Sequence, residues 1–353
     1  MGILGFAACG SVQSPASDAP ATDDARTIID GPPRLDAAID APAPAVIPSC
    51  VQLAATCGPD HLDSCCNSPD VLGGTYYRGF DRAVDPDSGN TSNPATISDF
   101  RLDKYEVSVG RFRKFLDAGF GNQNNPPVVR AGAHPNLQGS GWDATWNSLL
   151  PANTVALATQ LKCDPDGGTQ TWTDAATSVV NESRPINCVS WYVAMAFCAW
   201  DGGYLPTEAE WMYAAGGGTE QRALPWSIPA SALVLDPTKS SYYDGTNCVG
   251  DGAAGCLITD LLPVGSRPAG DARYGQSDLG GNVAEWTLDY TGAYPGNCTD
   301  CAQLAPTTTR QLRGGSFTDG KRFERVAFKV GLTPATSSPT AGIRCARPAL
   351  PHN

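Results

Sequence analysis

The sequence predicts one loop-rich α+β domain over residues 71–349, and three observations support that fold class. A chain of 353 residues is long enough to bury a sizeable core. Its 38 glycines, 29 prolines and 8 tryptophans are typical of a fold rich in loops and aromatic packing. Only a few segments show a clear helix or strand pattern. The net charge of -12 disfavours nucleic acid and anionic lipid as main partners.

Three segments are expected before the domain. Residues 1–9 resemble a truncated bacterial lipoprotein signal, in which small residues precede a cysteine that becomes lipidated, here Cys9. Residues 10–49 contain no aromatic residue and are rich in Asp, Ala, Pro and Ser, which predicts a disordered acidic tether. Residues 50–70 form a cysteine-rich cap. No stretch approaches the roughly eighteen apolar residues that a membrane-spanning helix needs.

The first elements of the domain follow from turn and cap signals. Residues 71–80 are expected to form a short strand with a glycine turn. Residues 98–119 predict a strand followed by a helix, with Ser108 as the N-cap. The buried face of this helix is expected to comprise Val109, Phe112, Phe115 and Leu116.

Two further helices are expected near the middle of the chain. Residues 189–203 predict an apolar helix that ends at a glycine pair. Residues 205–218 predict another, because Thr207 and Glu210 have the spacing of a capping box. The remainder is expected to be loops and short strands.

The cysteines indicate an oxidising compartment. Without Cys9, twelve of the thirteen remain, an even number typical of a disulfide set; buried free thiols are the alternative. In the cap, adjacent Cys65 and Cys66 have no matching second pair, which favours disulfides over a metal knuckle. The pairs Cys248 with Cys256 and Cys298 with Cys301 are close enough to be local disulfides, and the second could instead be a redox pair.

Six phrases in order identify a family resemblance. They are LGGTYYRG, FRLDKYEVSVGRFRKF, RPINCVSWYVAMAFCAWDGGYLPTEAEWMYAA, DLGGNVAEW, LRGGSF and AGIRCAR. Together they resemble the sulfatase-modifying-factor family, whose founder is the formylglycine-generating enzyme, over residues 70–349. The resemblance implies a single α+β domain with little regular structure, related to the C-type lectin fold. Family enzymes oxidise a sulfatase cysteine to formylglycine, using molecular oxygen and a copper(I) ion held by two cysteines.

The copper-binding cysteines of the family have no counterpart here. The matching positions are Asp319 and Glu324. Copper(I) prefers thiolate ligands and carboxylates suit hard cations, so the copper oxidase chemistry is expected to be lost. Two alternatives stay open for this pair: solvated surface acids, or groups that hold a hard metal or act as acid and base.

Some of the family's substrate cleft is expected to persist. Asn282, Ser316 and Arg325 match cleft positions, whereas Ala284 replaces a usual tryptophan and Thr340 a usual asparagine. The alternative for Asn282 and Ser316 is that they cap loop backbone. For Arg325 the alternative is a salt bridge to Glu324 or Asp319.

The phrase DLGGNVAEW also matches a family calcium site. The resemblance implies carboxylate ligands from Asp278 and Glu285 and backbone carbonyl ligands from Gly281 and Val283. Oxygen ligands in a glycine-bearing loop suit Ca²⁺. The alternative is that Glu285 only forms hydrogen bonds within the turn.

One of two family disulfides has both of its cysteines here, and the histidines of a related iron site are lacking. Cys198 and Cys345 match a family disulfide, whereas Ala214 and Lys329 occupy the positions of a second one. Another branch of the superfamily uses non-haem iron held by histidines. This chain has only His61, His134 and His352, too few and too scattered for that site.

The sequence therefore predicts an extracytoplasmic bacterial lipoprotein that binds a peptide or glycan in an altered cleft. Structural calcium is expected, and copper is not. The alternative is an active formylglycine-generating or related protein-modifying oxidoreductase with non-standard ligands. A purely structural surface domain is the third possibility, because fold does not fix function.

Overall fold

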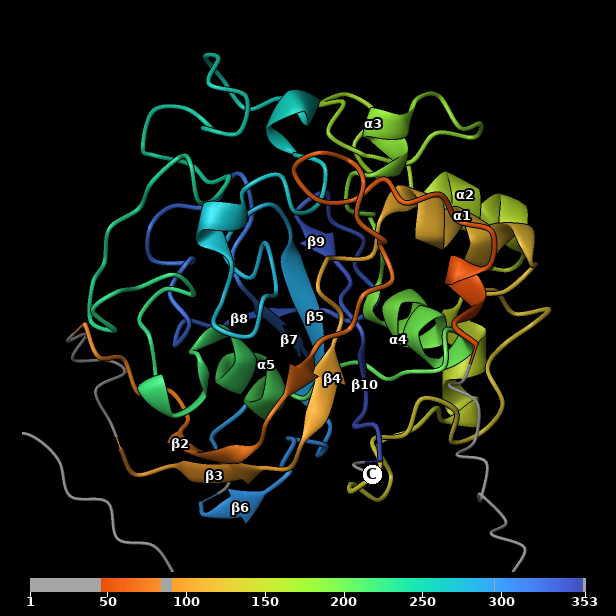
Figure 1. Cartoon of the computed structure of the whole chain (residues 1–353). Coiled ribbons are helices and arrows are strands. Elements are labelled where there is room, and N and C mark those ends of the chain that lie inside the picture. The colour runs from red at the N-terminus through yellow and green to blue at the C-terminus, as the bar shows by residue number, and fades with distance from the viewer. Residues whose placement is uncertain (1–45, 84–90, 295, 352–353) are drawn as a thin grey trace, which may run out of the picture. The chain divides into compact units, whose positions relative to one another are not determined.

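A computed structural model describes residues 46–83, 91–294 and 296–351. The lipoprotein-like segment with Cys9 and the tether up to residue 45 lie outside the described residues, as does His352. Within them the chain combines short helices, small sheets and long loops (Figure 1). The expected loop-rich α+β fold is thereby confirmed.

The strands form three small sheets in the described part of the chain. The first has the order β1–β4–β10, the second β2–β3–β6 and the third β8–β7–β5–β9. In the third sheet, β5 pairs antiparallel with β7 and parallel with β9. The bounds are β1 Asp70–Val71, β2 Gly74–Tyr77, β3 Pro94–Ile97, β4 Phe100–Leu102, β5 Ala284–Tyr290, β6 Cys298–Thr299, β7 Arg310–Arg313, β8 Val330–Leu332, β9 Ala341–Gly342 and β10 Ala346–Pro348.

Three of the helices lie where the sequence predicts them. In α1, Ser108 Oγ accepts a hydrogen bond from Arg111 N, which confirms the N-cap. In α5, Thr207 Oγ1 accepts from Glu210 N at 3.0 Å and Glu210 Oε2 accepts from Thr207 N at 2.8 Å, so the capping box is also confirmed. The bounds are α1 Val109–Asp117, α4 Trp191–Trp200 and α5 Glu208–Ala215.

The sequence analysis did not predict α2, Thr154–Gln160, or α3, Val179–Glu182. Both are short and begin with β-branched residues, which favour helices only weakly. Side-chain caps at Asn153 and Ser178 start them, each accepting a hydrogen bond from the first turn. The 3-10 helices are Pro48–Cys50, Ala144–Leu149, Gly218–Glu220, Ile258–Asp260 and Pro268–Gly270.

Two main apolar clusters form the core. Figure 1 shows α1, α2 and α4 together on one side of β5, with α5 between that strand and the sheet β2–β3–β6. The first cluster packs α1 and α4 against β5, and the second packs α5 against β2, β3 and β4. Both α4 and α5 are buried on nearly every side, which explains why apolar and aromatic residues surround their axes.

All twelve cysteines of the described residues are paired in six disulfides. The family disulfide Cys198–Cys345 is present, and so are both expected local pairs, so free thiols are excluded in this part of the chain. In the cap the sequence left the pairing open, and the structure shows two nested disulfides. The remaining bridges are Cys50–Cys66, Cys57–Cys65 and Cys163–Cys188.

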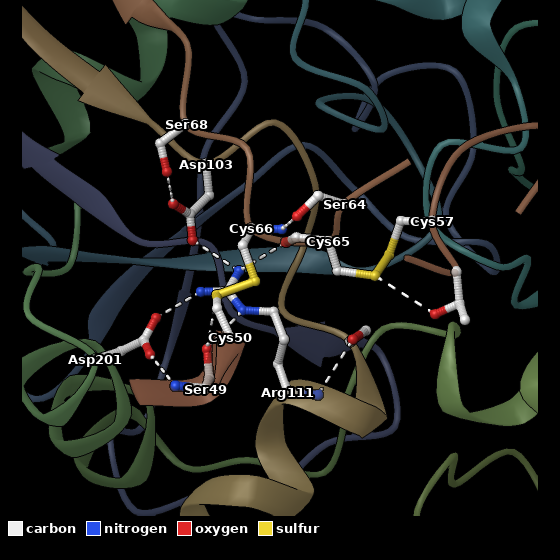
Figure 2. Close-up of a disulfide and its surroundings, with 12 residues drawn as sticks. Ser49, Cys50, Cys57, Ser64, Cys65, Cys66, Ser68, Asp103, Arg111 and Asp201 are labelled. Atoms are coloured by element: carbon white, nitrogen blue, oxygen red, sulfur yellow. Dashed lines mark hydrogen bonds and ion pairs between the residues drawn. A yellow bond between two sulfur atoms is a disulfide. The ribbon is translucent and has the colours of Figure 1, made fainter. Parts of the chain in front are cut away.

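A buried network of four charged side chains joins the cap to the domain. Arg111 on α1 donates to Asp103 Oδ2 at 2.8 Å and to Asp201 Oδ2 at 2.6 Å. Arg347 on β10 contacts the same two carboxylates, at 3.1 and 2.7 Å. Ser49, at the end of the segment expected to be a disordered tether, is instead buried: its backbone N–H donates to Asp201 and its Oγ accepts from Arg111, next to the Cys50–Cys66 disulfide (Figure 2). Equal numbers of opposite charges make this burial tolerable.

Candidate functional site

Two glycine-rich loops meet beside the third sheet. Gly281 donates its N–H to Gly314 O at 3.0 Å, and Phe317 donates to Asn282 O at 2.9 Å. Gly314 and Gly315 both have positive φ, 93° and 72°, which side chains rarely adopt. A Cβ on Gly315 would also stand 3.1 Å from Glu324 Oε1. The glycine pair therefore lets this loop close over Glu324.

A cavity of about 150 Å³ lies at the edge of the same sheet. Ala284 at the start of β5 and Thr340 just before β9 both line it, so the two positions that depart from the family pattern meet in one place. Asp319 lines it as well. The other lining residues are Leu312, Arg313, Gly314, Gly315, Phe323, Phe328, Val330, Leu332 and Ser338.

Asp319 is fixed by the serine of the GGS phrase. Its Oδ2 accepts from Ser316 N at 3.0 Å and from Ser316 Oγ at 2.7 Å, which closes a tight turn. Its backbone carbonyl accepts from Tyr243 N at 2.9 Å. Among the described residues no hydrogen bond reaches Oδ1. One carboxylate oxygen thus positions the loop, and the other is available for a ligand.

Glu324 is buried behind this turn, with 1% of its surface exposed. Burial raises the pKa of Glu324 well above its usual range, and Asp319 adds to the rise, while the hydrogen bond between Ser240 and Glu324 opposes it. Oε1 has no hydrogen-bond partner within the described residues. The two acids therefore have different environments, since Asp319 borders the cavity and Glu324 lies beneath it.

The contacts of Ser240 suit a protonated Glu324. Ser240 Oγ lies 2.8 Å from Gly280 O and 2.9 Å from Glu324 Oε2. A hydroxyl has one hydrogen, and a carbonyl oxygen can only accept. When Ser240 donates to the carbonyl, the contact with Glu324 requires a proton on the carboxyl group. A neutral Glu324 satisfies both contacts, which agrees with its burial.

These donors do not fit a copper(I) site. Two oxygen side chains stand at the positions that the resemblance assigns to the family's thiols, and burial raises the pKa of one of them, Glu324. Every cysteine in residues 46–83, 91–294 and 296–351 is in a disulfide, so no thiol nearby can substitute. The absence of copper from this protein stays a prediction.

The three residues expected in the cleft do not line the cavity. Asn282 Oδ1 accepts from Leu262 N at 3.0 Å, and its amide donates to Glu106 at 2.7 Å, so it braces buried loops. Ser316 holds Asp319 in the turn. Arg325 forms an ion pair with Asp81, not with either acid considered from the sequence. For Asn282 and Ser316 the geometry agrees with the alternative of loop capping.

The two carboxylates expected to bind calcium have other partners. Both oxygens of Glu285 contact Arg344, at 2.7 to 3.0 Å, and Trp211 Nε1 donates to Oε2 at 2.6 Å. Asp278 Oδ2 accepts from Gly265 N at 2.6 Å, and burial raises the pKa of Asp278 to about 6. Arg344 already neutralises Glu285, which disfavours a calcium shell built from these residues and the carbonyls of Gly281 and Val283, and the calcium site stays a prediction.

No cluster of three or more His, Cys, Asp or Glu that could hold a metal occurs among the described residues. His134 is buried, and its Nε2 lies 3.1 Å from Glu210 Oε1, while Nδ1 accepts from Asn136 N. His61 lies in the cap near Thr56. The histidines therefore give no iron site in this part of the chain.

The sequence analysis missed the aromatic wall of the cavity. Phe323 and Phe328 form an edge-to-face pair with ring centroids 4.8 Å apart. Both belong to the segment that follows the GGS phrase, and the substitutions at Ala284 and Thr340 were the available signal.

Lys329, at a lost cysteine position, lies 4.0 Å from the ring centre of Tyr294, and burial lowers its pKa to about 8.

Comparison with known proteins supports the fold and the family. A model described as sulfatase-modifying factor enzyme 1-like domain matches residues 56–349. The formylglycine-generating enzyme of Mus musculus is 28% identical over 308 residues, 80% of this chain and 75% of that protein. Inactive C-alpha-formylglycine-generating enzyme 2 of Bos taurus is 28% identical over 293 residues, 79% of this chain and 87% of that protein.

Among solved structures, PvdO from Pseudomonas aeruginosa has a similar fold, with a TM-score of 0.53 at 18% identity. The match covers 84% of this chain and all of PvdO, 100%. In the described part of the chain no helix is long and apolar enough to cross a membrane. From the extent of the match to the family model, the chain belongs to the sulfatase-modifying factor family.

Proposed function

We propose that this protein is a non-catalytic family member that binds a peptide or glycan ligand in the altered cleft. The observation that carries the proposal is the donor set at the former copper positions. Asp319 and Glu324 supply oxygen there, and the cysteines of the described residues are all in disulfides. Copper(I) has no thiolate to bind in this region, so the oxidation of cysteine to formylglycine lacks its metal ligands.

The kept cavity supports binding. Loss of the family's thiols has not closed the loop, because the glycine pair and Ser316 still hold the turn that ends at Asp319. Ala284 leaves open space where a tryptophan is usual, and the walls are mainly apolar and aromatic. Binding sites commonly combine such walls with a few polar groups. One relative is named as an inactive formylglycine-generating enzyme, so loss of activity has a precedent among similar proteins.

An extracytoplasmic location is part of the proposal. Six disulfides within the described residues suit an oxidising compartment and are rare in reducing cytosol. Lipidation of Cys9 would hold the domain at a bacterial membrane or cell surface, and this anchor would be its only contact with lipid. Mass spectrometry of the mature N-terminus tests the anchor, and an unmodified Cys9 in mature protein would contradict it.

The catalytic test uses copper(I), molecular oxygen and a Cys-x-Pro-x-Arg peptide, with the peptide cysteine followed by mass spectrometry. We expect no formylglycine from folded protein. A double variant, Asp319→Cys with Glu324→Cys, is the matched control, because it restores thiols at the family positions. Formylglycine formation by the unmodified chain would refute the proposal and favour an oxidoreductase with non-standard ligands.

The binding test uses peptide and glycan arrays with the full chain. We expect a defined set of ligands whose signal falls when Ala284→Trp fills the cavity. Featureless arrays would contradict the binding role and leave a structural surface domain as the better explanation.

A further inference from the structure

The cavity beside Ala284 has a charge and shape that select a particular ligand. Its volume of about 150 Å³ far exceeds the roughly 10–15 Å³ that one water requires. Ala284 at the start of β5 lines this cavity and is only 8% exposed, and its small side chain leaves the space beside it open. An occupant must therefore be a group of several non-hydrogen atoms.

Most of the wall is apolar. Leu312 of β7 and Val330 and Leu332 of β8 line one side, where neighbouring strands present side chains to the same space. Phe323 and Phe328 complete it with their edge-to-face pair. Such a wall favours an alkyl chain, since each buried methylene contributes through its removal from water.

Asp319 supplies a carboxylate to this apolar space. Ser316 occupies only Oδ2, so Oδ1 is free to accept a hydrogen bond from a ligand. A positive donor is favoured because hydrogen bonds to a charged partner are stronger than neutral ones. Aromatic faces also attract cations, and the guanidinium carbon of Arg322 already lies 4.7 Å from the centre of the Phe328 ring.

The other polar side chains that line the cavity are compatible with a positively charged ligand. Arg313 lines the cavity, but its guanidinium forms an ion pair with Glu208 and donates to the backbone carbonyls of Val326 and Phe328. Ser338 and Thr340 bring two hydroxyl oxygens 2.8 Å apart, and each can accept from an N–H group. A carboxylate ligand would instead meet Asp319 as a like charge.

Resting on the proposed binding function, we propose that this cavity binds a primary ammonium group carried on a short alkyl chain. The ammonium hydrogen-bonds Asp319 Oδ1, and the chain occupies the space between Ala284 and the phenylalanine pair. A lysine side chain of a peptide and a free alkylamine share this chemistry. The separate arms of the experiment distinguish these two sources.

Isothermal calorimetry on the full chain tests the proposal with n-butylamine, n-butanol and butyrate. We expect butylamine to bind about tenfold or more tightly than butanol, as a charged hydrogen bond requires, and butyrate not to bind. N-acetyl-lysine methylamide and its ε-acetylated form provide the peptide arm. Preference for the charged form there identifies a lysine side chain as an acceptable ligand, and binding of butylamine alone identifies a free amine.

Variants locate the binding. Asp319→Asn should remove the preference for butylamine over butanol, and Ala284→Trp, or the smaller Ala284→Leu, should abolish binding of both. Asp117→Asn is the matched control, because it removes an exposed carboxylate on α1 outside the cavity. Circular dichroism and Tm confirm that each variant is folded.

Equal affinity for butylamine and butanol would overturn the role of Asp319. Undetectable binding of both to folded protein, or unchanged binding in Ala284→Trp, would overturn the assignment of the cavity. In either case positive peptide or glycan arrays would leave the proposed function standing with a different ligand.

Discussion

Asp103 offers a sharp test of how the buried charge network stabilises the domain. Asp103 accepts from Arg111 and Ser68 (Figure 2). It also accepts from Arg347, and it has no exposed surface. Burial alone would raise the pKa of Asp103, but the two arginines and the hydrogen bonds hold it at about 2. The folded state therefore binds its proton much more weakly than the unfolded chain.

The size of the effect follows from that difference. A decrease from 3.8 to about 2 corresponds to about 2.4 kcal/mol in the free energy of unfolding at neutral pH. Because the folded pKa is lowered, this contribution is complete above the unfolded value and is lost as pH falls through about 2. Asp103→Asn removes one charge and leaves Arg111 and Arg347 sharing Asp201, so we expect a loss of about 3–5 kcal/mol at neutral pH.

Urea unfolding of wild type and Asp103→Asn across acidic and neutral pH measures both quantities. The stability difference between them should shrink by about 2 kcal/mol as pH falls from neutral toward 2. Asp117→Asn, at the exposed end of α1, should leave stability nearly unchanged. The explanation fails if Asp103→Asn costs less than about 1 kcal/mol, within the range of exposed pairs, or if its difference from wild type does not depend on pH.

Three other predictions concern the neutral acid, the long disulfide and the expected calcium site. Because burial raises the pKa of Glu324, the free energy of unfolding of the wild type should fall as pH rises above the ordinary glutamate range. Glu324→Gln should remove that fall and be the more stable protein at pH about 8. If the variant and the wild type show the same dependence on pH, Glu324 is ionised in the folded protein and the reasoning is wrong. Replacing Cys198 and Cys345 by alanine opens a loop of 147 residues and should cost about 5 kcal/mol by the chain-entropy estimate, seen as a lower Tm; a cost below about 1 kcal/mol would contradict it. Since Glu285 is held in an ion pair, millimolar CaCl₂ should leave the Tm of EDTA-treated protein unchanged, and a rise that disappears in Asp278→Asn would show that a calcium site forms after all.

The sequence by itself determined the family, the fold class and the local elements with strong signals. The helix after Ser108 and the capping box of Thr207 and Glu210 were predictable, because a cap requires only residues within one turn of each other. The carboxylates Asp319 and Glu324, which the resemblance places at the copper positions, were equally visible. The short helix at Val179–Glu182 was not, since its few residues have weak propensity and depend on the surrounding contacts.

Only the tertiary structure decided which side chains share a site. Asn282, Ser316 and Arg325 match cleft positions in sequence, but their hydrogen bonds and ion pair are directed into the surrounding loops. Ala284 and Thr340 lie 56 positions apart along the chain and meet only because β5 pairs with β9. The raised pKa of Glu324 likewise depends on its burial beneath Gly315. Such properties arise from contacts between residues distant in sequence, and no local pattern of residues encodes those contacts.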